Sequence, residues 1–133
     1  MPRIDGRTNS QTRTIQFDIG VQKFSLGSVL VRYGDTAVLC SANIEEKVPQ
    51  WLNGRGQGWL TAEYSMLPGC SAQRVTRDRT KVGGRTHEIQ RLIGRSLRTC
   101  IDLKAFGERS LLVDCDTAIN LSARRTSPRK LIK

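Results

Sequence analysis

The sequence predicts a mixed α/β domain of the α+β type, in which a sheet of about five strands packs with one long amphipathic helix. Two observations support this prediction. In the first half of the chain, apolar residues alternate with polar ones or form β-branched runs, as strands require. The apolar spacing then changes to offsets of three and four, which is typical of one helix face, before a strand pattern returns.

Four strands are expected before the helix. The first depends on alternating apolar residues, namely Ile15, Phe17 and Ile19, which predict a half-buried strand. Two β-branched runs at 28–33 and 36–44 meet at Gly34 and predict a hairpin. A further apolar run at 59–66 ends before Pro68, which interrupts regular structure.

One helix is expected after the strands. Its apolar face is formed by Ile89, Leu92, Ile93, Leu97, Cys100 and Ile101. The arginines of the same segment lie toward the other face, namely Arg91, Arg95 and Arg98. Asp102 falls late in this helix, which Gly107 is expected to end just after Phe106. The segment 110–116 returns to a strand pattern.

Charge and cysteine content limit the class of protein. A formal net charge of +10 favours a polyanionic partner such as a nucleic acid. The four cysteines form no C-x-x-C pair and the single histidine is His87, so no zinc site of familiar spacing is predicted. No apolar run approaches the roughly 20 residues of a membrane-spanning helix, and the N-terminus has no signal core. We therefore expect a cytoplasmic protein with reduced thiols and no membrane contact.

Several short motifs occur in a fixed order along the chain. The longest lie at 54–68 and 84–95. The shorter ones are Arg3-x-Asp5-Gly6-Arg7 with Gln11, Gly27-Ser28-Val29-Leu30-Val31 with Gly34-Asp35-Thr36, Asp102-Leu103-Lys104-Ala105 with Gly107-Glu108, and Asp114-Cys115-Asp116. Over residues 3–116 the chain resembles ribonuclease PH, a phosphate-dependent 3′ to 5′ exoribonuclease and tRNA nucleotidyltransferase that trims transfer RNA precursors.

The resemblance implies a transferase active in the processing of transfer and ribosomal RNA. Such an enzyme binds RNA 3′ ends, passes terminal nucleotides to inorganic phosphate and releases nucleoside diphosphates. It works as a homo-oligomer, a hexameric ring, with Mg²⁺. The resemblance also implies that residues 1–116 form an incomplete copy of a duplicated fold, the ribonuclease-PH-like N-terminal half.

Residues 117–133 are expected to form a divergent basic tail. They contain five basic and no acidic side chains, which accounts for half of the net charge of +10. Family members continue here into a Gly-Gly-Thr-Arg-Thr phosphate loop and a second half, so we expect a truncated or frameshifted C-terminus. The catalytic carboxylates of the family belong to that second half, and no catalytic residue is assigned in this chain.

Arg85 is the principal candidate for phosphate binding. It follows two glycines just before the predicted helix, where backbone N–H groups and the helix dipole favour an anion. Its guanidinium can bind phosphate bidentately, and it matches the phosphate-binding arginine of the resembling family. From the residues alone, a surface arginine is the alternative. Arg125 is a second candidate, but Ser122-Ala123-Arg124 replaces the family's Gly-Gly-Thr there, and a solvated tail residue is its alternative.

Arg74 and Arg77 are the candidates for RNA binding. They lie in a polar, arginine-rich segment at 70–84, which predicts an exposed loop. The resemblance implies that such arginines hold the acceptor end of transfer RNA through phosphate contacts. An ordinary solvated loop is the alternative, and Gly69 stands where family members often have another arginine.

The carboxylates Asp114 and Asp116 are two residues apart on a predicted strand, so they share a face and could flank a cation. Two ligands are few for Mg²⁺, and the wet end of a strand is the alternative. No metal ligand is therefore assigned.

Two functions remain open from the sequence. The first is the phosphorolytic enzyme, with the activity of this short chain itself uncertain. The second is a non-catalytic RNA-binding or ring-assembly subunit that keeps the same basic residues. In either case, missing partner elements would leave apolar surface exposed.

Overall fold

The structure is a computed structural model that describes residue 3 and residues 6–76 and 82–119. Its elements are, in order, β1 (Ile15–Ile19), β2 (Gly27–Tyr33), β3 (Thr36–Glu45), the 3-10 helix η1 (Gln50–Leu52), β4 (Trp59–Met66), α1 (Gly84–Arg98), α2 (Leu103–Phe106) and β5 (Ser110–Ile119). The predicted mixed α/β class and all of the predicted strands are confirmed. β5 continues past Asp116, where the domain was expected to end, to Ile119.

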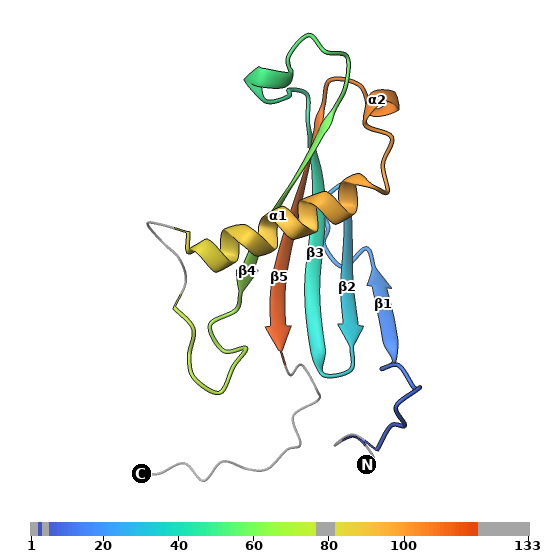
Figure 1. Cartoon of the computed structure of the whole chain (residues 1–133), viewed down its shortest axis with the longest axis vertical. Coiled ribbons are helices and arrows are strands. Elements are labelled where there is room, and N and C mark those ends of the chain that lie inside the picture. Colours follow the sequence, from blue (N-terminus) through green and yellow to red (C-terminus); the bar gives the residue numbers. More distant parts are fainter. Residues whose placement is uncertain (1–2, 4–5, 77–81, 120–133) are drawn as a thin grey trace.

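The strands form one sheet in the order β1-β2-β3-β5-β4 (Figure 1). β1, β2, β3 and β5 pair antiparallel, whereas β4 pairs with β5 in parallel. A parallel pair needs a long crossover connection, and the chain between β4 and β5 provides one that includes α1 and α2. The sheet therefore has two edge strands, β1 and β4.

The predicted hairpin joins β2 to β3 through Gly34. Tyr33 pairs with Thr36, and Gly34 has a positive φ of 61°, a conformation that glycine adopts without a Cβ clash. The N–H of Gly34 donates to the carbonyl oxygen of Thr14 at 3.1 Å. This hydrogen bond ties the segment before β1 to the hairpin turn.

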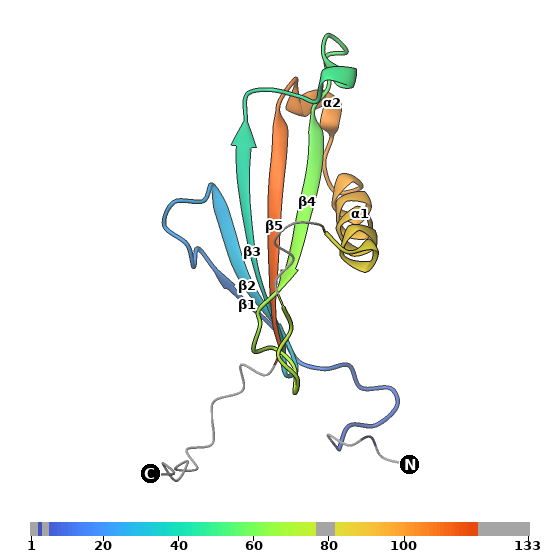
Figure 2. The same cartoon turned by 90° about the vertical axis from the view of Figure 1, so that its left-hand side faces the viewer.

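The core lies between the sheet and α1, which covers one face over β4 and β5 (Figure 2). Its buried residues are Leu60, Ala62, Val113 and Cys115. Ile93 and Leu97 of α1 pack against them. Gly94 is buried where α1 comes close to the backbone of β4. A Cβ added at Gly94 would lie 4.0 Å from the backbone nitrogen of Ala62.

The prediction of one uninterrupted helix up to Phe106 is wrong. α1 ends at Arg98, and the Thr99 hydroxyl donates to the carbonyl oxygen of Ser96 at 2.7 Å. Asp102 does not lie late in a helix but caps α2, accepting hydrogen bonds from the N–H groups of Lys104 at 3.0 Å and Ala105 at 3.1 Å. Side chains that bind nearby backbone groups end and restart helices in this way. Gly107 ends α2, in agreement with the sequence.

The helix faces also differ in part from the prediction. Leu92 and Cys100, expected on the apolar face, are exposed, because α1 packs on β4 through a narrower stripe. Arg98, expected toward solvent, is half-buried instead, since its Nε donates to the Leu60 carbonyl oxygen at 2.9 Å.

β1 is not half-buried as predicted. Its alternating apolar residues are exposed, with Phe17 at 63% and Ile19 at 85% of full exposure. The reason is positional: β1 is an edge strand at the opposite side of the sheet from β4, over which α1 lies (Figure 2). An apolar cavity of about 450 Å³ extends between these side chains and Leu97 of α1.

No helix in the described part of the chain has the length and apolarity to cross a bilayer.

Candidate functional site

Arg85 lies in the first turn of α1, and its side chain is exposed. Gly83 before the helix is extended, with φ −67° and ψ 153°, and provides no side-chain cap. The first turn also has no acidic residue. The positive end of a fifteen-residue helix and a guanidinium group are therefore close together. This combination is unfavourable alone and becomes favourable when an anion binds.

The position of Arg85 depends on how α1 is held at its other end. There the Arg98 guanidinium lies 4.0 Å from the centroid of the Trp59 ring and donates to the Leu60 carbonyl oxygen. Burial, with a smaller contribution from Arg95, lowers the pKa of Arg98 from its ordinary value. The packing of Ile93 and Leu97 on β4 completes the attachment. α1 is thus attached to the sheet through its second half, and its first turn carries Arg85.

Arg74 lies in the segment that leaves β4, and its side chain is exposed as predicted for a loop residue. Two backbone hydrogen bonds shape this segment, from the N–H of Cys70 to the Leu67 carbonyl oxygen at 3.0 Å and from the N–H of Val75 to the Pro68 carbonyl oxygen at 3.1 Å. Arg74 therefore lies in the connection between β4 and α1, and Arg85 lies in the helix that follows it. Arg77 and Arg125 lie outside the described residues.

The carboxylates of β5 lie on the face of the sheet opposite α1. Asp116 accepts a hydrogen bond from the Ser65 hydroxyl, and Asp114 lies beside Glu63 in the β4–β5 register. Among the described residues, no group of three or more histidine, cysteine or carboxylate side chains is arranged to hold a metal ion. Asp114 and Asp116 are central-strand residues, not the free wet end of a strand, and they do not fit a Mg²⁺ centre by themselves.

Two cysteines face each other across the centre of the sheet. Cys40 of β3 and Cys115 of β5 are direct partners in the antiparallel register, and both are free thiols. A hydrogen bond with the Cys115 thiol lowers the pKa of Cys40 to about 7, although burial and Asp116 act in the opposite direction. The same hydrogen bond, together with burial, raises the pKa of Cys115. The pair therefore shares one proton, and Cys40, which is less buried, ionises first.

Cys40 is expected to react with a small disulfide reagent near neutral pH, with the rate rising as the pH passes through about 7, because the thiolate is the nucleophile. In Cys115→Ala, the pKa of Cys40 should move back toward its ordinary value. The smaller thiolate population outweighs the gain in nucleophilicity, so reaction at pH 7 should slow by about fivefold. Mass mapping after timed quenching measures Cys40 separately. Cys115→Ser keeps a donor and is the control; equal rates in all three proteins would contradict the shared proton.

A comparison with models of protein families shows which family this chain matches. The family model described as the 3′ exoribonuclease family, domain 1, matches residues 11–120. The chain belongs to this family. The match includes all of the strands and both α-helices, and therefore Arg74 and Arg85.

Curated members of the family are similar over nearly the whole chain. Ribonuclease PH of Crocosphaera subtropica is 54% identical over 125 residues, which is 94% of this chain and 52% of that protein. Ribonuclease PH of Dehalococcoides mccartyi (strain ATCC BAA-2266) is 52% identical over 129 residues, which is 96% of this chain and 54% of that protein. The chain thus spans about half the length of the curated relatives it matches.

Solved structures share the fold at lower identity. A chain of the Archaeoglobus fulgidus exosome with RNA bound to the active site superposes with a TM-score of 0.74 at 22% identity, covering 89% of this chain and 48% of that one. Rrp46 of rice (Oryza sativa) superposes with a TM-score of 0.70 at 17% identity, covering 89% and 52%. At these identities the comparison establishes the fold, and the mixed sheet with α1 on one face is the shared part.

Proposed function

We propose that this chain is the phosphate- and RNA-binding half of a phosphorolytic 3′ to 5′ exoribonuclease that trims transfer RNA precursors. The observation that supports this most directly is Arg85, which is exposed in the first turn of α1. The chain that carries it is 54% identical over 125 residues to a protein named ribonuclease PH. Phosphate bound there would contact a guanidinium fork and the positive helix end together.

In this reaction an oxygen of inorganic phosphate attacks the phosphorus of the last phosphodiester. The 3′ oxygen of the preceding nucleotide leaves, and the terminal nucleotide is released as a nucleoside diphosphate. Two anions must approach each other, so a cation between them lowers the barrier by offsetting their repulsion. Arg85 performs that task in our proposal. The group that protonates the leaving oxygen is not assigned in this chain.

RNA is held in this proposal by Arg74, with Arg77 as a further candidate. Arg125 is the second candidate for phosphate, and both Arg77 and Arg125 lie outside the described residues. Arginine contacts to phosphates position a strand without reading its sequence, as a processive trimming enzyme requires. The related fold in the archaeal exosome core makes a ring assembly a reasonable proposal, and a homo-hexamer in the cytoplasm is our expectation. Mg²⁺ is implied by the family, but we assign it no ligand among the described residues.

The test is a phosphorolysis assay on a transfer RNA precursor, with and without inorganic phosphate. We expect nucleoside diphosphates to appear only when phosphate is present, as resolved by thin-layer chromatography of end-labelled RNA. Binding of RNA without any release would favour the alternative, a non-catalytic RNA-binding or ring-assembly subunit. Release of nucleoside monophosphates would show hydrolysis and would contradict the phosphorolytic mechanism.

A further inference from the structure

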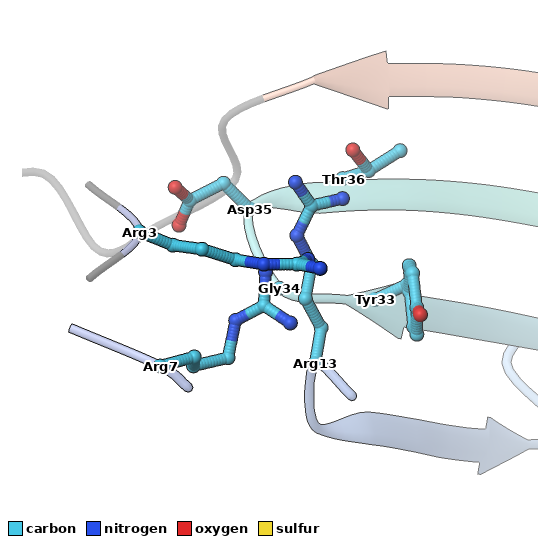
Figure 3. Close-up of a pocket in the computed structure, with 7 residues that line it drawn as sticks. All are labelled: Arg3, Arg7, Arg13, Tyr33, Gly34, Asp35 and Thr36. Atoms are coloured by element: carbon cyan, nitrogen blue, oxygen red, sulfur yellow. The ribbon is translucent and has the colours of Figure 1, made fainter. Parts of the chain in front are cut away.

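A cavity of about 590 Å³ opens beside the turn between β2 and β3, and no residue of α1 is among those that line it. We call it the turn pocket. Three arginines line it, Arg3, Arg7 and Arg13, and Figure 3 shows their guanidinium groups gathered around Gly34. Among the described side chains that line it, Asp35 is the acidic one. The turn pocket therefore concentrates positive charge at one end of the sheet.

The three arginines are held in place by the local backbone. The N–H of Gly6 donates to the Arg3 carbonyl oxygen at 2.8 Å, and the N–H of Arg3 donates to the Arg7 carbonyl oxygen at 3.3 Å. Nη1 of Arg7 donates to the Gln11 carbonyl oxygen at 2.9 Å. Hydrogen bonds among the described residues thus join the segments that carry Arg3 and Arg7.

Arg13 is fixed by the hairpin itself. Its guanidinium carbon lies 5.7 Å from the centroid of the Tyr33 ring, and its Cδ passes close over Gly34, 2.9 Å from where a Cβ would stand. The hydrogen bond from Gly34 to Thr14 holds the two segments together. The pairing of β1 with β2 brings Arg13 to this turn, because Ile15 is the partner of Tyr33.

Like charges collected in one cavity repel, and a bound anion removes that cost. The contacts that the structure describes for the guanidinium groups of Arg3 and Arg13 are with neutral groups, the Asn9 carbonyl oxygen and the Tyr33 ring. Guanidinium forks match phosphate oxygens bidentately. The ring of Tyr33 lies beside these guanidinium groups and is 39% exposed. Proteins that bind single-stranded nucleic acids combine cations, which contact the phosphates, with aromatic rings, on which the bases stack.

The turn pocket lies at the same end of the sheet as the loop that contains Arg74. Thr36, which follows the turn, pairs with Ile119 of β5, and Thr117 of β5 pairs with Met66, the last residue of β4 before that loop. β3 and β4 are separated by one strand, a distance of about 10 Å. A single extended strand of RNA can therefore cross this end of the sheet and meet both basic regions (Figure 1).

We propose that the turn pocket binds the phosphodiester backbone of single-stranded RNA, as a site separate from Arg74 and Arg85. Only the choice of RNA as the ligand rests on the proposed function; the anion site itself rests on Arg3 and Arg13, whose described contacts are with neutral groups. The pocket acts by positioning the substrate strand at a distance from the reacting phosphate. Its removal should weaken RNA binding without changing the response to inorganic phosphate.

The test is Arg3→Gln combined with Arg13→Gln, which removes two charges and keeps side-chain stems that can pack on Gly34. Binding of a fluorescent single-stranded RNA is measured by anisotropy at several salt concentrations. We expect affinity at about 0.1 M salt to fall by roughly tenfold or more, and the slope of log K against log salt to decrease by about 1.4, at about 0.7 for each lost phosphate contact. A structural defect alone would not change the slope in this way.

The matched control is Arg55→Gln with Lys104→Gln, which removes the same charge from exposed positions just before β4 and in α2. The start of β4 pairs with Ser110, at the end of the sheet opposite the turn pocket. It should leave the slope nearly unchanged. Arg3→Lys with Arg13→Lys retains the charges and should restore the slope, which makes the test decisive even if the glutamine variant folds poorly. An unchanged slope in a folded glutamine variant would overturn the proposal.

Two further arms identify the ligand. If polyglutamate competes with RNA for the wild-type chain as well as unlabelled RNA does, the pocket is a site for an acidic protein and the proposal is overturned. If the glutamine variant loses its thermal stabilisation by inorganic phosphate, the pocket is a free-phosphate site, and the proposal is also overturned. Arg85→Ala tests the proposed function separately, because it should change the phosphate response and leave the RNA salt slope nearly intact.

Discussion

Replacing Arg85 by alanine is expected to remove most of the thermal stabilisation that inorganic phosphate gives this chain. Arg85 is exposed in the first turn of α1, a turn that contains no acidic residue. Hydrogen bonds to a charged group contribute about 1.5–3 kcal/mol, so the affinity for phosphate should fall by roughly 10-fold to 100-fold. The measurement is the melting temperature against phosphate concentration, since a ligand that binds the folded state stabilises it in proportion to RT ln(1 + [L]/Kd).

Two variants separate the site from general charge effects. Arg91→Ala removes an exposed arginine from the same helix beyond its first turn and should keep the phosphate response. Arg85→Lys keeps the charge but loses the planar fork, so its affinity should be intermediate. Sodium chloride at matched ionic strength accounts for screening. A phosphate response that is the same in wild type and Arg85→Ala would remove the basis of the proposed function.

The strands could be predicted from the sequence because their signal is local. In β2 and β3 the β-branched runs and the glycine turn between them are sufficient, since a hairpin pairs neighbouring segments. The parallel pairing of β4 with β5 could not be read in this way. It joins Trp59 to Ser110, and only the packing of α1 over both strands makes that arrangement favourable.

The break between α1 and α2 has a different cause. The apolar period continues through Ile101, so periodicity alone favours one helix. The break depends on the hydrogen bonds of Thr99 and Asp102 to nearby backbone groups, which compete with helix continuation by amounts that periodicity does not measure. An aspartate three residues before Ala105 was an available capping signal.

The position of Arg85 could be predicted to within a turn, because the amphipathic period begins just after it; the structure places it in the first turn of α1, whereas the sequence predicts a place just before the helix. The turn pocket could not be predicted with the same ease. Arg3 and Arg13 are brought to Gly34 by the pairing of β1 with β2, a contact between segments some twenty residues apart. The sequence did contain one signal for this pocket. Arg3, Arg7 and Arg13 come just before β1, and the strand that pairs with β1 is followed by a turn at Gly34.

Gly58→Ala is expected to cause the largest loss of stability of any single methyl addition in the described part of the chain. An added Cβ would lie 2.5 Å from Cδ1 of Phe106, 2.6 Å from the Gly107 carbonyl oxygen and 2.8 Å from the Arg109 carbonyl oxygen. Two of these atoms are backbone oxygens held by hydrogen bonds. The Gly107 oxygen accepts from the N–H of Arg109 at 2.7 Å, and the Arg109 oxygen accepts from the N–H of Trp59 at 2.9 Å. The clash also threatens the 2.7 Å hydrogen bond from the N–H of Gly58 to the Leu103 carbonyl oxygen.

Overpacking of this kind costs about 3 kcal/mol in the free energy of unfolding when neighbouring atoms cannot move. Urea titration followed by circular dichroism measures it, with a lower midpoint and an unchanged slope as the expected result. Gly69→Ala is the matched control, because open space surrounds Gly69 and its φ is not positive, so its change should stay within about 0.5 kcal/mol. Gly54→Ala also has open space but a φ of +76°, so backbone strain alone should cost about 1 kcal/mol. The loss of unfolding free energy should therefore decrease in the order Gly58→Ala, Gly54→Ala, Gly69→Ala, which separates steric contact from backbone strain. A Gly58→Ala protein as stable as Gly69→Ala would contradict close packing of the α2 region against the start of β4.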